Sequence, residues 1–149
     1  MYEVRAEEMW DRFIKKNKLM DCSYDEWSFG VDADVLAHLV VTGQKIATSS
    51  AYPLYELKNE QLPQKGEYNV ILDSNNDAVC IIQTQNVEII SFNEITPEHA
   101  YKEGEGDRSL DYWKKVHEDF FSKCMRDEGL EFTGNMKVVF EEFVVVYKL

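Results

Sequence analysis

The sequence has few basic side chains and no long apolar run. Its 149 residues include 16 Lys and Arg against 28 Asp and Glu, a formal net charge of −12. A body of this charge repels phosphate backbones and anionic lipid, which disfavours binding to long RNA. No apolar stretch approaches the roughly 20 residues of a membrane helix, and acidic residues precede any apolar block, unlike in a signal peptide. We therefore expect a cytoplasmic protein that binds no membrane.

Cysteine and histidine are also scarce, with three of each. The cysteines are far apart, odd in number and without CxxC spacing, which argues against a disulfide framework or a zinc knuckle. Reduced, buried thiols are expected at Cys22, Cys80 and Cys124. His117 has no second histidine one turn away and shares a stripe with Trp113 and Phe120, so we interpret it as a core or rim side chain. Neither a metal nor another cofactor is expected.

Apolar periodicity predicts three main helices, since apolar residues recur at spacings of three and four. These helices are expected at 3–19, from a cap at Asp32 or Asp34 to a stop at Gly43, and from an Asp107 cap to Cys124. Single helical turns are expected at 53–58 and, behind a Thr96 cap, from Pro97. Residues 24–30 are interpreted as a connection.

β-Branched and aromatic residues predict strands at 45–49, 68–72, 78–83, 87–92 and 137–147. Asp73, Asn75 and Asp77 imitate the start of a calcium loop, but Ala78 stands where that loop needs glycine, so the segment predicts a hairpin turn. The order of elements indicates a single α+β domain over residues 1–149, with helices around a mixed or barrel-like sheet.

Three carboxylates alternate with glycines at Glu103-Gly104-Glu105-Gly106-Asp107. One reading is a solvated loop that leads to a helix cap. A carboxylate held against a lysine could instead act as an acid or base, and three carboxylates could gather a divalent ion. The spacing by itself leaves these alternatives open.

A glycine turn, a lysine and three hydroxyls follow one another from Thr42 to Ser50. A hydroxyl becomes a good nucleophile only when a base takes its proton. Lys45 follows a predicted helix C-terminus, whose dipole favours the charged ammonium, so this lysine is better suited to bind an anionic oxygen than to act as a base. We expect such a cleft lysine to contribute little to stability.

The motif Gly43-x-Lys45-x-x-Thr48, followed by Glu103-Gly-Glu-Gly-Asp-Arg-Ser-Leu110 and Trp113, resembles the ASCH domain over nearly the whole chain. The resemblance implies a PUA-like mixed β-barrel flanked by helices, with a cleft where the two motifs meet and a role in binding RNA or nucleotides. One similar bacterial branch hydrolyses the amide of N4-acetylcytidine with a lysine, a threonine and a glutamate. By position these would be Lys45, Thr48 and Glu103, although Ser50 stands where that branch has arginine.

Two hypotheses follow for the function. In the first, an amidohydrolase uses Thr48 as nucleophile, Lys45 as activator or oxyanion partner and Glu103 to move the proton. In the second, a non-catalytic module binds RNA or a nucleotide. The expected ligand-binding residues are Gly43, Ser49, Ser50, Asp107, Arg108 and Trp113. Because the net charge is −12, we favour a small nucleoside or nucleotide ligand over long RNA. Either hypothesis requires Lys45 and Glu103 to meet in space.

Overall fold

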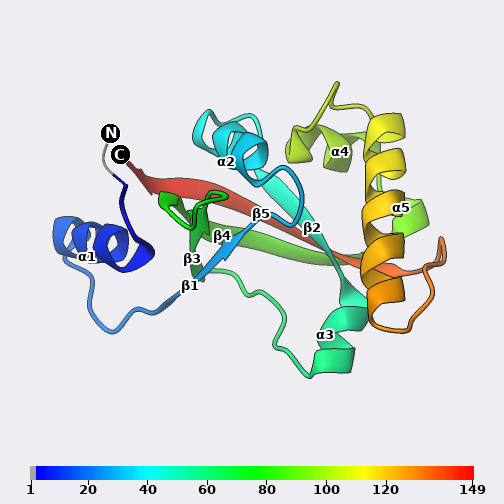
Figure 1. Cartoon of the computed structure of the whole chain (residues 1–149), viewed down its shortest axis with the longest axis horizontal. Helices are drawn as coiled ribbons and strands as arrows, with labels where there is room; N and C mark the ends of the chain where they lie inside the picture. Colours follow the sequence, from blue (N-terminus) through cyan, green and yellow to red (C-terminus); the bar gives the residue numbers. More distant parts are fainter. Residues whose placement is uncertain (1–2) are drawn as a thin grey trace.

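The computed structural model describes residues 3–149. Within them, five strands form one sheet in the order β1-β3-β4-β5-β2. The strands are β1 (Tyr24–Ser28), β2 (Ala47–Ala51), β3 (Tyr68–Leu72), β4 (Ala78–Ser91) and β5 (Lys137–Lys148). Strands β1 and β3 are parallel, and the other neighbours are antiparallel. The sheet twists and curls, and its long strands β4 and β5 form the back of a half-barrel (Figure 1).

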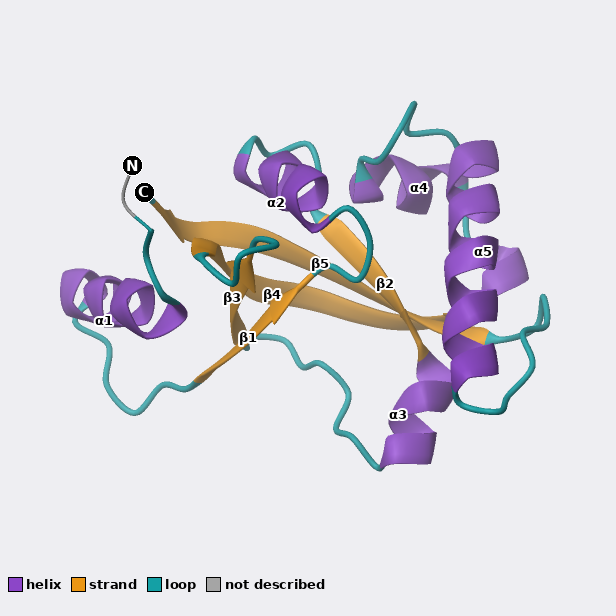
Figure 2. Ribbon diagram, in the orientation of Figure 1, coloured by secondary structure: helices purple, strands orange, loops and turns teal. Residues whose placement is uncertain are grey.

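The helices lie around this sheet (Figure 2). They are α1 (Ala6–Asn17), α2 (Ala33–Val41), α3 (Tyr52–Lys58), α4 (Pro97–Glu103) and α5 (Leu110–Asp127), with a 3-10 turn η1 (Phe92–Glu94) before α4. Among residues 3–149, no helix has the length and apolar character needed to cross a bilayer. The arrangement confirms the α+β prediction, with helices around a mixed, barrel-like sheet.

Three apolar clusters hold the helices against the sheet. Helix α1 buries Trp10 and Phe13 against β3 and β4. Helix α2 buries Val40 against the middle of the sheet. Helices α4 and α5 cover the other end, where Trp113 and Phe121 pack with Phe92. This third cluster fixes α5 against the sheet, and the same helix lines the pocket described in the next subsection.

The local signals of the sequence are confirmed at several turns and caps. The Thr96 hydroxyl accepts from the His99 backbone N–H at 3.2 Å, and His99 Nδ1 accepts from the Thr96 N–H at 3.0 Å, which closes a capping box. The Asp73 carboxylate accepts from the Asn75 and Asp77 N–H groups at 2.8 and 3.0 Å. The segment therefore forms the predicted turn, and this carboxylate is used by the backbone.

Two strand predictions were wrong. Residues 24–28 form β1 instead of a connection, because they pair in parallel with β3, which lies more than 40 residues further along the chain. The two strands expected at 78–83 and 87–92 are one strand, β4, which runs from Ala78 to Ser91, and Phe92 begins η1. Strand β4 pairs with β5 on both sides of Thr84 and Asn86, and a shift in register between these two residues lets the strand continue through its polar segment.

The cap of α5 and the burial of the cysteines also differ from expectation. The N-cap is Ser109, whose hydroxyl accepts from the Tyr112 N–H at 3.1 Å, whereas Asp107 accepts from the Ser109 N–H one step earlier. Cys80 is buried, and burial raises the pKa of its thiol to about 12. Cys124 is half-buried and Cys22 is exposed, because Cys22 lies in the loop before β1.

Candidate functional site

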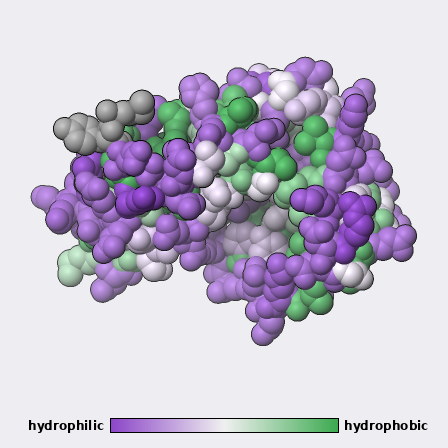
Figure 3. Space-filling view, in the orientation of Figure 1, coloured by the Kyte–Doolittle hydropathy of each residue, from purple (hydrophilic) through white to green (hydrophobic). Residues whose placement is uncertain are grey.

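A pocket lies at the open side of the curled sheet. It has a volume of about 530 Å³ and is bordered by both edge strands, β1 and β2, and by α5. Figure 3 shows a hollow on this face with a largely hydrophilic rim. A pocket of about 300–1,000 Å³ is the usual size for a small-molecule site. Strands β1 and β2 are the two edges of the sheet and do not pair with each other, so the pocket occupies the gap between them.

Gly104 holds the two predicted motifs together at the pocket. It ends α4 with a φ of +73°, and a side chain there would overlap the Gln44 carbonyl oxygen. Gln44 Nε2 donates to the Gly104 carbonyl at 2.6 Å, and the Ile46 N–H donates to the Lys102 carbonyl at 2.9 Å. The backbones therefore approach as closely as only a glycine permits.

Lys45 crosses from this junction into the interior and is 1% exposed. Its Nζ lies 2.8 Å from Glu105 Oε2 and 3.4 Å from Glu103 Oε1, and it also donates to the Glu103 carbonyl at 3.4 Å. The ammonium stands 5.4 Å from the centre of the Phe29 ring. Two carboxylates and an aromatic face therefore surround this buried ammonium.

Glu103 is the centre of the polar network and is also 1% exposed. Its Oε2 accepts from the Ser49 hydroxyl at 2.6 Å and from the Trp113 indole N–H. Its Oε1 faces Lys45 Nζ and His117 Nε2, each at 3.4 Å. Burial opposes ionisation, but the charges of His117 and Lys45, with hydrogen bonds from His117 and Ser49, outweigh it and lower the pKa of Glu103 to about 2.

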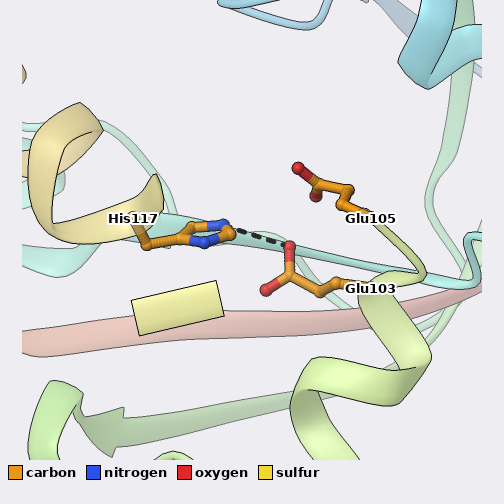
Figure 4. A group of neighbouring side chains, drawn as sticks. All are labelled: Glu103, Glu105 and His117. Carbon is orange, nitrogen blue, oxygen red and sulfur yellow. Dashed lines mark ion pairs between the residues drawn. The ribbon is translucent and has the colours of Figure 1, made fainter. Parts of the chain in front are cut away.

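His117 completes the network from α5. Its ring stacks on Trp113 at 4.1 Å between centroids, and its Nδ1 is 2.9 Å from the Trp113 carbonyl oxygen, which can only accept. Burial disfavours the imidazolium, yet Glu103, through charge and a hydrogen bond, makes the net effect a raised pKa. The interpretation of His117 as a core or rim side chain is correct for its burial but missed this ion pair, because Glu103 lies on another element (Figure 4).

Glu103, Glu105 and His117 also form a possible metal-binding set. Figure 4 shows them converging, and one donor atom from each lies within 4.8 Å of the others. However, Lys45 Nζ contacts both carboxylates, and the raised pKa of His117 favours a second positive charge. Two cations therefore already balance two anions, and a divalent ion would have to displace the ammonium. This donor set fits a metal poorly.

Comparison with known proteins identifies the family. The ASCH domain model matches residues 25–147. The chain belongs to the ASCH domain family. An ASCH domain from Lactobacillus crispatus JV V101 is 32% identical, with a TM-score of 0.87 over 93% of this chain and 92% of that chain. The protein EF3133 from Enterococcus faecalis V583 is 36% identical, with a TM-score of 0.88 over 94% and 86%. None of the curated proteins matches the chain.

The fold is therefore the PUA-like half-barrel of ASCH domain structures, as the resemblance implied. In this ASCH domain the pocket is lined by Lys45 and Glu103 together with all three successive hydroxyls, Thr48, Ser49 and Ser50. The expected meeting of Lys45 and Glu103 is confirmed. Residue alternation in β2 separates the hydroxyls: Ser49 is bound to Glu103, whereas Ser50 shares a 2.8 Å hydrogen bond with the Tyr55 hydroxyl.

The other expected ligand-binding residues of the ASCH domain lie outside this pocket lining. Gly43 ends α2 with a φ of +85° and borders a different hollow beside β5. Asp107 accepts from the Ser109 N–H, and Arg108 stacks on Tyr101, donating to the Tyr101 carbonyl at 2.9 Å. Trp113 is 2% exposed beneath Glu103. Asp107, Arg108 and Trp113 therefore make contacts that position the loop and the network, and Gly43 ends α2 away from this pocket.

Sequence reasoning missed a second group of polar side chains in the pocket. Glu141, on β5, is 7% exposed and accepts from the Thr84 hydroxyl at 2.5 Å. Asn69 accepts from the Trp27 indole N–H at 2.9 Å, and both line the same space. Two adjacent glutamates, Glu141 and Glu142, interrupt the apolar strand 137–147, and alternation must turn one of them toward the inner face, which is the signal that could have indicated Glu141.

Proposed function

We propose that this ASCH domain hydrolyses the amide of a small acylated nucleoside, with N4-acetylcytidine as the model substrate. Thr48 is the nucleophile, and the Lys45 ammonium stabilises the oxyanion that forms when the carbonyl is attacked. The observation that carries the proposal is the buried Lys45–Glu103 pair beside the hydroxyls of β2 in a single pocket. A buried ion pair is costly in a core, and a functional site is where such a cost is expected.

Glu103 acts in this proposal as a positioning residue. Its pKa of about 2 and its contacts with Ser49, Trp113, Lys45 and His117 keep it ionised at neutral pH. It therefore fixes the Lys45 ammonium in place through their ion pair. Glu103 is therefore not the group that moves the proton in this proposal, because a carboxylate with such a low pKa is a poor general base.

The charge of the pocket favours a nucleoside over a nucleotide. Its lining has seven carboxylates but a single lysine, and that lysine is already paired. The carboxylates are Asp25, Glu26, Glu60, Glu67, Glu103, Glu105 and Glu141. A phosphate would enter against this field, whereas an uncharged base and ribose would not. The rings of Trp27, Phe29 and Phe120 supply apolar wall for the base.

A non-catalytic nucleoside-binding pocket is the second function, and the saturated hydrogen bonding of Glu103 favours it. The experiment that separates the two functions is an assay of cytidine release from N4-acetylcytidine. We expect turnover by the wild type and a loss of at least about 100-fold in Thr48→Ala and in Lys45→Met, with losses that do not add in the double variant. Thr42→Ala, a threonine outside the pocket lining, is the matched control.

The outcomes of that assay are distinct. Turnover that survives Thr48→Ala would assign the nucleophile to water or Ser49. Binding of the nucleoside without release of cytidine by the wild type would leave only the binding function.

A further inference from the structure

The proposed reaction needs a group that accepts the hydroxyl proton of Thr48. Glu103 is unsuited to that task because both of its oxygens are engaged, by Ser49 and Trp113 on one side and by Lys45 and His117 on the other. The Lys45 ammonium is already paired with Glu103 and Glu105, and an ammonium has no lone pair to offer. The base must therefore come from another part of the pocket.

Glu141 has the required position. It is the register partner of Thr48 across the antiparallel pair of β2 and β5. Partners in such a pair project to the same face of the sheet, with Cβ atoms about 4.5–5.5 Å apart. Both residues line the pocket. The carboxylate is oriented by Thr84, whose hydroxyl donates to Oε2 at 2.5 Å from the adjacent strand β4.

We infer that Glu141 is the general base and acid of this site, a role that rests on the proposed hydrolase function. Its carboxylate takes the proton of the Thr48 hydroxyl as that oxygen attacks the amide carbon. The same proton then passes to the leaving nitrogen as the C–N bond breaks, which releases the amine and leaves an ester on Thr48. In the second half, water attacks the ester, Glu141 accepts a proton from the water and returns it to the Thr48 oxygen, and the carboxylic acid departs.

The surroundings of Glu141 suit this exchange better than those of Glu103. Burial raises the pKa of Glu141, the hydrogen bond from Thr84 lowers it, and the charge of Glu67 raises it, with a net upward shift. Tyr55 of α3 also lines the pocket, where burial, the larger cause, and the charges of Glu141, Glu60 and Glu67 raise the pKa of its hydroxyl. The other titratable groups of the lining are Asp25 and Glu26 of β1, and the group of Lys45, Glu103, Glu105 and His117, which are already paired with one another.

The test is a pH–rate profile for N4-acetylcytidine hydrolysis by the wild type, Glu141→Gln, Thr84→Val and Glu142→Gln. Glutamine keeps the size of Glu141 and an oxygen for Thr84, so we expect an unchanged KM with kcat lower by about 100-fold or more. Glu142→Gln is the matched control on the opposite face of the same strand, where Glu142 pairs with Lys102; it should stay within about threefold of the wild type.

Thr84→Val keeps the carboxylate but removes the hydrogen bond that lowers its pKa. The acidic limb of the kcat/KM profile should therefore move to higher pH, which a purely structural role for Glu141 would not produce. The pH–rate profile of Thr84→Val also tests whether Glu141 is the base if the Glu141→Gln variant fails to fold.

The two hypotheses fail differently. If the wild type and Glu141→Gln hydrolyse the substrate equally, with an unmoved acidic limb in Thr84→Val, Glu141 is not the base while the hydrolase function stands. If the wild type releases no cytidine, both proposals are overturned.

Discussion

Replacing Glu103 with Gln tests the electrostatic account of the site, because it removes one charge and keeps the size of the side chain. Lys45 Nζ and His117 Nε2, each 3.4 Å from Oε1, lose an anionic partner. The amide oxygen still accepts from Ser49. We expect a folded protein that is less stable at neutral pH, with the pKa of His117 lowered toward its ordinary value because the charge of Glu103 raises it.

The magnitude follows from the pKa of Glu103. Its fall from 4.5 to about 2 on folding corresponds to about 3 kcal/mol, at about 1.4 kcal/mol per pH unit. Because the folded-state pKa is the lower one, this stabilisation is present above pH 4.5 and is lost as pH falls from 4.5 toward about 2. His117 has the opposite sign: its raised pKa stabilises the fold below 6.5, and the effect is lost as pH rises through its folded-state value.

The assay is urea denaturation followed by tryptophan fluorescence at a series of pH values. Glu103→Gln should lower the free energy of unfolding by about 3 kcal/mol near pH 6, and the difference should shrink as pH approaches about 2. Glu142→Gln, which breaks an accessible pair with Lys102, should cost less than about 1 kcal/mol. A loss in Glu103→Gln that is independent of pH, or no larger than that of the control, would refute the reasoning.

Three further predictions concern the junction, the lysine and the charge of the surface. Lys45→Met should lower the free energy of unfolding by about 3–5 kcal/mol in urea at neutral pH, since it leaves two carboxylates without their ammonium. A loss below about 1 kcal/mol would instead support the small contribution to stability expected from the sequence. Gly104→Ala, which places a methyl group on the Gln44 carbonyl at a φ of +73°, should lower stability by about 1–3 kcal/mol, seen as a lower Tm; an unchanged Tm would contradict the close approach. Fluorescence anisotropy with unstructured single-stranded RNA should show no submicromolar binding at about 0.15 M salt, and such binding would promote the RNA-binding function.

The helices and turns could be predicted from the sequence because their causes are local. Apolar spacing gives α1, α2 and α5, and the side chains of Thr96 and Asp73 bond to backbone groups within four residues. Strand β1 was not predicted because it pairs with β3, which is distant in the sequence and lies beside β1 only in the folded sheet.

The candidate site, like the fold, could be predicted only in part. The resemblance of the two motifs to those of one family correctly predicted that Lys45 and Glu103 lie together. The burial of Lys45 was not foreseen, because it depends on Glu103, Glu105 and the ring of Phe29, which come from two other segments of the chain. Glu141 was missed for a related reason. Its place in the pocket depends on pairing with Thr48, and the two residues lie on strands nearly 100 residues apart in the sequence.

The most direct test of the central claim is intact-protein mass spectrometry of the wild type mixed with N4-acetylcytidine and quenched within one turnover, followed by peptide mapping. The account predicts a transient acetyl ester on Thr48 that appears together with cytidine and accumulates in neither Thr48→Ala nor Lys45→Met. Cytidine release without an adduct, or an adduct on Ser49, would contradict the assignment of Thr48 as the nucleophile of this pocket.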